Sequence, residues 1–178
     1  GCVWEQTEQK NMGQVKGHPI ADLSQIDRYP MPDYSQDWWW TKTSAAIAEN
    51  ETAERYIRGG IFMILFERMQ ALLGFEALMM GLLAERPAME LLADRIVETQ
   101  LTLVRQFSQR FGKRIHGITM SEDWGTQNAA FIRFDLWMDF FAPRYRRLFD
   151  AMHAAGYDVF GYDHRGHGQS RQVGGPYT

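Results

Sequence analysis

The stretch AMELLADRIVETQLTLVRQFSQRF, residues 88–111, sets the expectation for the whole fold. Its apolar side chains recur at helical spacing on one stripe, and Pro87 stands where the first turn of a helix accepts proline. We therefore predict a long helix that buries one face and ends at Gly112. The stripe comprises Met89, Leu92, Ile96, Leu103, Phe107 and Phe111.

Apolar runs on both sides of this helix predict a sheet. IFMILF, residues 61–66, follows two glycines and is typical of a strand buried on both faces, although a buried helix through IFMILFERMQALL is an alternative. RIHGITM, residues 114–120, and YDVFGY, residues 157–162, are the next predicted strands. Strands that alternate with helices indicate right-handed βαβ units, so we predict an α/β fold with a parallel sheet.

Three further helices and an irregular N-terminal segment complete the expected organisation. Ser44 suits the N-cap of a helix over 45–56, residues 75–83 have helical spacing, and Pro143 begins the main helix of the region 135–155. In that last helix we expect four inward side chains: Tyr145, Leu148, Phe149 and Met152. The expected parts are thus a loop-rich segment 1–44, an α/β body 45–162 and a Gly-rich tail 163–178.

Within residues 1–44, prolines exclude a long helix, so we expect extended surface chain with turns. Trp38, Trp39 and Trp40 would anchor this segment to the body by hydrophobic contact. A stacking platform made of these indoles is the less favoured alternative.

Composition bounds the class of protein. The chain has 178 residues, of which 45% are hydrophobic and 23% charged, with a formal net charge of -3. This describes one domain with a core, shorter than the roughly 250 residues of a complete (β/α)8 barrel, and it argues against a nucleic-acid partner.

No apolar run is long enough to span a membrane. The single cysteine, Cys2, excludes an internal disulfide, so we expect a cytoplasmic protein. The chain begins with glycine and has no visible targeting peptide, so we expect a fragment or a processed chain.

Two polar loops follow predicted strand ends, where parallel α/β folds bind ligands. In SEDWGTQ, residues 121–127, Glu122 and Asp123 are adjacent acids beside Trp124. An acid held in a dry pocket against the indole would keep its proton and donate it, so both are candidate catalytic residues. Alternatively, one acid caps a turn or pairs with Arg133. Trp124, Thr126 and Gln127 are candidate substrate-binding residues.

Glu67 and Arg68 follow the first predicted strand in the same way. Arg68 could bind a substrate carboxylate in two-pronged geometry, or pair internally with Glu122 or Asp123.

The second loop, GYDHRGHGQS, residues 161–170, contains Asp163, His164 and His167. Asp163 could face a ligand there. The two histidines with this carboxylate are weak candidates for a metal site, because such spacing is common by chance, and we expect no metal.

Two stretches in the middle and C-terminal parts of the chain carry a family resemblance. DWGTQ, residues 123–127, and LWMDFFAPRYRRLFDAMHAAGYDVF, residues 136–160, resemble the uroporphyrinogen decarboxylase superfamily. Earlier pieces, including LADRIVETQ at 92–100, look similar to the same family. The resemblance implies part of a (β/α)8 TIM barrel and a lyase of porphyrin biosynthesis that decarboxylates a tetrapyrrole-type polycarboxylate without a cofactor. It places Glu122 and Asp123 in the strand-end loop of that family.

Related branches of the superfamily transfer a methyl group between a cobamide-bound carrier and a thiol with zinc. They have a His-Ser-Cys-Gly type motif where this chain has Tyr162, Asp163, His164 and Arg165, so the thiolate ligand is missing.

The C-terminal segment carries a second, local resemblance. GYDVFGYDHRGHGQS, residues 156–170, is similar to α/β-hydrolases of the lysophospholipase type, but the sequence lacks Gly-x-Ser-x-Gly and Ser170 lies in GQSRQ. We thus expect a decarboxylase acting on a small polycarboxylate, with no membrane or nucleic-acid partner. The alternatives are zinc-dependent methyl transfer, ester hydrolysis, and a truncated non-catalytic chain whose open sheet edges favour homo-oligomers.

Overall fold

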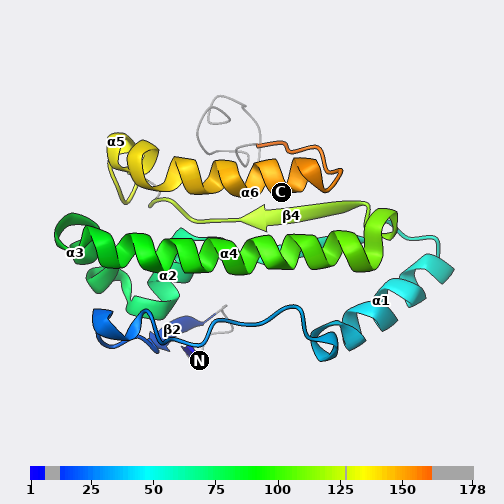
Figure 1. Cartoon of the computed structure of the whole chain (residues 1–178), viewed down its shortest axis with the longest axis horizontal. Helices are drawn as coiled ribbons and strands as arrows, with labels where there is room; N and C mark the ends of the chain where they lie inside the picture. The colour runs from blue at the N-terminus through cyan, green and yellow to red at the C-terminus, as the bar shows by residue number, and fades with distance from the viewer. Residues whose placement is uncertain (7–12, 127, 162–178) are drawn as a thin grey trace.

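Helix α4 (Arg86–Phe111) is the longest element and lies across the middle of the molecule (Figure 1). The computed structural model describes residues 1–6, 13–126 and 128–161. The prediction for α4 is confirmed, with Pro87 in its first turn and Gly112 at its C-cap with a positive φ of 49°. Its predicted stripe is buried except for Leu103, which is half-buried.

Two parallel strands lie beside α4. β3 (Arg58–Phe62) pairs with β4 (Gly117–Ser121) in a register that runs from Arg58 opposite Gly117 to Phe62 opposite Ser121. The chain between them forms α2 (Phe66–Leu73), α3 (Phe75–Ala84), α4 and the short η3 (Gly112–Arg114). The predicted α/β class with a parallel sheet is therefore confirmed in this coarse form.

The predicted strand over 61–66 was wrong in its bounds. Strand β3 ends at Phe62, and Phe66 already begins α2. Met63 between them has a φ of 55°, a left-handed conformation that an extended strand cannot continue through. The alternative of a buried helix through IFMILFERMQALL is correct only from Phe66 onward, where α2 begins.

The predicted third strand over 157–162 is not formed in its described part, since Tyr157–Gly161 is irregular and Tyr162 lies outside the described residues. Within the described residues the parallel sheet has two strands, and no closed barrel is present.

The sheet has one covered face. Ile61 on β3 packs with Val104 of α4 and Met152 of α6 (Ala142–Ala154), and Ile118 and Met120 of β4 pack against the same group. Figure 1 shows β4 between α4 and α6. On the opposite face Arg58, Gly60 and Phe62 are exposed.

Helix α6 follows α5 (Phe134–Leu136) and the π-helical segment η4 (Trp137–Phe141). Pro143 lies in its first turn, as predicted, and Tyr145, Leu148 and Met152 are buried. Phe149 was expected to face inward but is 36% exposed.

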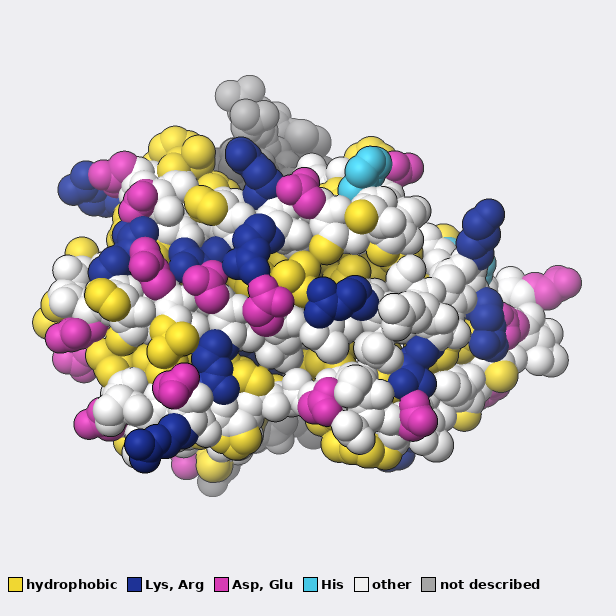
Figure 2. Space-filling view, viewed as in Figure 1, with side chains coloured by type: hydrophobic (Ala, Val, Ile, Leu, Met, Phe, Trp, Pro, Cys, Tyr) yellow, Lys and Arg dark blue, Asp and Glu magenta, His cyan; other side chains and the backbone are white. Residues whose placement is uncertain are grey.

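Ion pairs join the first half of α6 to α4. Arg144 is buried and contacts both carboxylate oxygens of Asp94, at 3.0 and 3.2 Å, and Arg147 binds Asp94 and Glu98. Figure 2 shows the basic and acidic side chains alternating over this part of the surface. These contacts link α6 to α4 at one side of the molecule.

The largest core cluster joins α2, α3, α4 and α6 with Ile20 and Ile26 of the N-terminal segment. That segment contains β1 (Val3–Glu5) and β2 (Gln14–Gly17), which pair in antiparallel fashion, and η1 (Leu23–Gln25). None of the helices in the described parts is long and apolar enough to cross a membrane.

Segment η2 (Asp37–Trp40) leads into α1 (Thr41–Thr52), which begins three residues before the predicted cap Ser44. Trp40 is buried against Phe107 and Phe111, so it anchors the segment as expected. Trp38 and Trp39 do not, because they are exposed and stack on each other at 4.1 Å.

Candidate functional site

The carboxylate of Glu122 receives backbone N–H groups from the start of α2. Leu65 and Phe66 donate to Oε2 at 2.8 and 3.1 Å, and Glu67 donates to Oε1 at 2.8 Å. Glu122 directly follows β4 and α2 closely follows β3, so parallel pairing brings the two strand ends together. The structure thus places predicted site residues from both segments in one cluster.

The chain shape at the end of β3 explains this contact. The first N–H groups of a helix have no partner within it, and the helix dipole makes that end positive. The N-cap of α2, Leu65, has no capping side chain of its own. After the left-handed turn at Met63, the free N–H groups point to Glu122, which caps α2 from a distant part of the sequence.

Tyr145 of α6 completes the surroundings of Glu122 by donating its hydroxyl to Oε2. Aromatic rings enclose the pair: Trp124 lies edge-on to Tyr145 at 6.0 Å and to Phe141 at 4.9 Å, and it stacks on Phe66 at 4.7 Å. Four donors therefore hold one carboxylate against a largely apolar wall.

Burial raises the pKa of two carboxyl groups in this cluster. For Glu122 burial is the largest cause, and the hydrogen bonds from Tyr145 and the α2 backbone oppose it. For Glu67 burial is again the largest cause, followed by repulsion from Glu122. The pKa of the Tyr145 hydroxyl lies well above its usual value because of burial and the nearby Glu122 charge. The hydroxyl therefore stays protonated and acts as a donor.

Asp123 and Glu67 are linked at the surface side of the cluster. The backbone N–H of Asp123 donates to Glu67 Oε2 at 3.1 Å, and Asp123 Oδ1 accepts the N–H of Gly125 at 3.2 Å. Glu67 is half-buried whereas Asp123 is exposed. The carboxyl of Glu67 thus lies against the backbone of Asp123, and the Asp123 side chain is near enough to raise the pKa of Glu67.

Arg68 is held by the end of β3. Its Nε donates to the carbonyl of Met63 at 3.1 Å and its Nη2 to that of Phe62 at 2.8 Å. The expected alternative of an ion pair between Arg68 and Glu122 or Asp123 is absent among the described residues, and Arg133 pairs with Asp135 instead.

The rest of the predicted set is less engaged. Thr126 Oγ1 binds the carbonyl of Ala129 and the N–H of Asn128, which closes its own loop. No group of three or more potential metal ligands occurs in the described parts of the chain. Four predicted candidates lie outside the described residues: Gln127, Asp163, His164 and His167.

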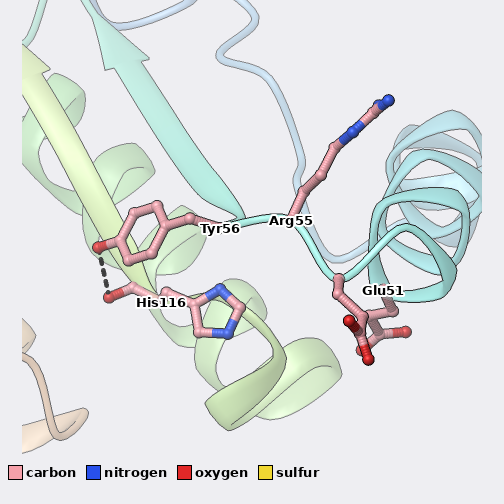
Figure 3. A pocket seen from close by; sticks show the side chains of 5 residues that line it. Glu51, Arg55, Tyr56 and His116 are labelled. Carbon is pink, nitrogen blue, oxygen red and sulfur yellow. Dashed lines mark hydrogen bonds between the residues drawn. The ribbon is translucent and has the colours of Figure 1, made fainter.

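Two hollows lie at the other end of the sheet. One, of about 420 Å³, is lined by Glu51, Glu54, Arg55, Tyr56 and His116 (Figure 3). Tyr56 donates to the carbonyl of His116 at 3.0 Å, and the ring of His116 accepts the N–H of Ile57. The second, of about 510 Å³, lies between α1, β3 and α4. Because parallel sheets bind ligands at the carboxyl ends of their strands, the carboxyl cluster is the better candidate.

Tyr145 is the member of the site that sequence reasoning missed. It was predicted as an inward side chain, which is correct, but without a polar role. A buried tyrosine hydroxyl needs a hydrogen-bond partner, so an inward Tyr in a helix that follows an acidic strand end was the available signal.

One comparison with known proteins gives a match. A family model described as serine aminopeptidase, S33, matches residues 141–177, which is well under half of the chain. The matched residues run from the end of η4 through α6 and include GYDVFGYDHRGHGQS. No curated protein and no solved structure matches the chain.

This match overturns the resemblance to the uroporphyrinogen decarboxylase superfamily. The block FFAPRYRRLFDAMHAAG, which carried much of that resemblance, lies almost entirely inside the segment that matches the aminopeptidase family. The expected decarboxylase activity on a tetrapyrrole, the methyl-transfer alternative and the TIM barrel of that family were therefore wrong. The physical reason is that apolar spacing on an amphipathic helix is shared by unrelated α/β proteins.

Proposed function

We propose that the carboxyl cluster hydrolyses an ester or amide bond in a small substrate, with Glu67 as proton donor and Asp123 as the base that activates water. The observation that carries the proposal is the half-buried carboxyl of Glu67, whose pKa is raised, beside the exposed carboxylate of Asp123. Neighbouring carboxyl groups in unlike surroundings divide the acid and base roles between them.

The local match to a serine aminopeptidase family supports hydrolysis as the reaction class. The nucleophile that we assign is water, because the exposed Asp123 lies at the surface side of the cluster, where solvent reaches it. The single cysteine favours a reducing compartment, and we place the reaction in the cytoplasm.

The proposed reaction consumes one water molecule. Asp123 takes a proton from water as its oxygen attacks the substrate carbonyl carbon. The bond from that carbon to the leaving oxygen or nitrogen then breaks, and the leaving atom takes the proton from Glu67. The products are a carboxylic acid and an alcohol or amine, and Glu67 regains through solvent the proton that Asp123 received.

Arg68 indicates which kind of substrate the cluster would bind. Two of its nitrogens are bound by Phe62 and Met63, while Nη1 has no partner within the described residues. A substrate carboxylate would meet that N–H at the same strand end, so we favour a small anionic ester or amide. Trp124 would provide an apolar wall beside it.

The test measures the hydrolysis of p-nitrophenyl esters and aminoacyl p-nitroanilides through release of their coloured product. Each substrate is compared with an analogue that carries an additional carboxylate. We expect Glu67→Gln to lower the rate about 100-fold, the usual contribution of one general acid. The rate should also fall as pH rises through the raised pKa of Glu67, because the donor then loses its proton.

The matched control is Glu76→Gln, which changes an exposed glutamate in the first turn of α3. It should keep the wild-type rate. Absence of turnover by the wild-type chain on every substrate, or full activity of Glu67→Gln, would contradict the proposal.

A further inference from the structure

Tyr145 brings a hydroxyl from α6 to a pair of carboxyl groups that belong to two other elements. Glu67 lies on α2 and Glu122 follows β4, and the charge of Glu122 raises the pKa of Glu67. Interacting carboxyl groups take up their first proton as a pair, so the geometry decides which one holds it.

The hydrogen bonds to Glu122 stabilise its ionised form and oppose the burial that raises its pKa. Its two oxygens receive three backbone N–H groups and the Tyr145 hydroxyl, and all four donors favour a carboxylate. If Oε2 carried a proton, its own O–H group would face these donors, and their hydrogen bonds to Oε2 would be weakened. The ionised form of Glu67 is less stabilised, since a single N–H, that of Asp123, donates to it within the described residues.

We infer that Tyr145 is a positioning residue which keeps Glu122 ionised and thereby holds the proton of the pair on Glu67. Its own position is fixed by packing, because it is 6% exposed and its ring stacks on Trp137 at 6.0 Å. The role of Glu67 as an acid rests on the proposed function, but the placement of the proton does not.

The other charged groups around the pair are compatible with this division. Arg68 on α2 lowers the pKa of Glu67, and Asp123 after β4 raises it, and both effects are smaller than burial and the charge of Glu122. From α6, Tyr145 provides the hydroxyl, and its strongest electrostatic partner is Glu122. The hydroxyl is thus the group whose removal changes Glu122 most directly.

The test is a pH titration of the full chain by NMR, with ¹³C labels on the glutamate carboxyl carbons assigned to Glu67 and Glu122. In the wild type we expect the carboxyl of Glu67 to take up the first proton as pH falls. In Tyr145→Phe the proton affinity of Glu122 should rise about tenfold, which is the usual strength of one hydrogen bond to a charged group. The first proton should then move to Glu122.

Tyr56→Phe is the matched control, because it removes a tyrosine hydroxyl that donates to the carbonyl of His116 at the other end of the sheet. It should leave the order of titration unchanged. If Glu122 takes the first proton in the wild type, or if Tyr145→Phe keeps the wild-type order, the inference is overturned.

Where Tyr145→Phe fails to fold, 3-fluorotyrosine at position 145 replaces it. The fluorinated hydroxyl is a stronger donor of the same shape, so the two titration steps should separate further, and unchanged steps would overturn the inference. These outcomes are independent of turnover, so a correct titration order in a chain that hydrolyses nothing would reject the proposed function alone.

Discussion

Glu122 links three parts of the molecule through one side chain. It follows β4, caps the start of α2 and accepts the hydroxyl of Tyr145 on α6. A helix usually receives its cap from a residue at its own beginning, but Leu65 cannot provide one. The carboxylate therefore does structural work, and the proposed chemistry falls to Glu67 and Asp123 beside it.

At the residue scale the raised pKa values predict a pH-dependent stability. Folding raises the pKa of Glu67 above its ordinary value of 4.5, so the folded state holds the proton more tightly than the unfolded chain. This contribution is fully present below pH 4.5 and is lost as pH rises through the raised pKa. In Glu67→Gln the free energy of unfolding should therefore fall less steeply as pH rises, as measured by urea denaturation at several pH values. Glu76→Gln should retain the wild-type slope, and an equal slope in Glu67→Gln would reject the assignment.

At the element scale α4 organises the core because one of its faces is buried along most of its length. Its buried residues contact the helices on either side and the covered face of the sheet. Amphipathic spacing over so many turns leaves few competing conformations, which is why this helix was correctly predicted. The run 61–66 was harder, since six apolar residues fit both a strand and a buried helix.

Two adjacent leucines test that element. Leu92 is 0% exposed and Leu91 is 41% exposed, although both lie on α4. We expect Leu92→Ala to lower the free energy of unfolding by about 3 kcal/mol through the lost contacts and the cavity left behind. Leu91→Ala should cost less than about 1 kcal/mol. Equal losses in chemical denaturation would show that the buried face is assigned incorrectly.

At the scale of the whole molecule, the N-terminal segment packs into the same core as the helices. Ile20 and Ile26 are buried in the largest cluster, and Arg95 of α4 donates to the carbonyls of Ile26 and Tyr29. These contacts satisfy the polar backbone of a segment that has no long helix or large sheet of its own. The helical body thus gives this segment its shape.

Arg95→Met should release that segment while leaving the helices folded. We expect faster hydrogen exchange over residues 20–30 and unchanged protection in α4, because the lost hydrogen bonds serve the segment alone. Arg105→Met is the control, since Arg105 bonds to Thr102 on its own helix at 3.0 Å. Unchanged exchange over residues 20–30 in Arg95→Met would show that the apolar contacts suffice.

The sequence by itself determined the features that depend on near neighbours in the chain. The amphipathic α4, its end at Gly112, the first turn of α6 around Pro143 and the α/β class follow from local spacing and backbone preference. It also indicated acids at a strand end, because the position of SEDWGTQ after an apolar run is a local pattern.

Tertiary structure decided the features that depend on distant partners. Whether Glu122 is a proton donor or a helix cap depends on the N–H groups of Leu65 and Phe66, more than fifty residues away in the chain. The hydroxyl of Tyr145 and the division of Trp38, Trp39 and Trp40 between surface and core were decided in the same way. The physical reason is that hydrogen bonding and burial depend on which segments meet in space, and local spacing does not specify that.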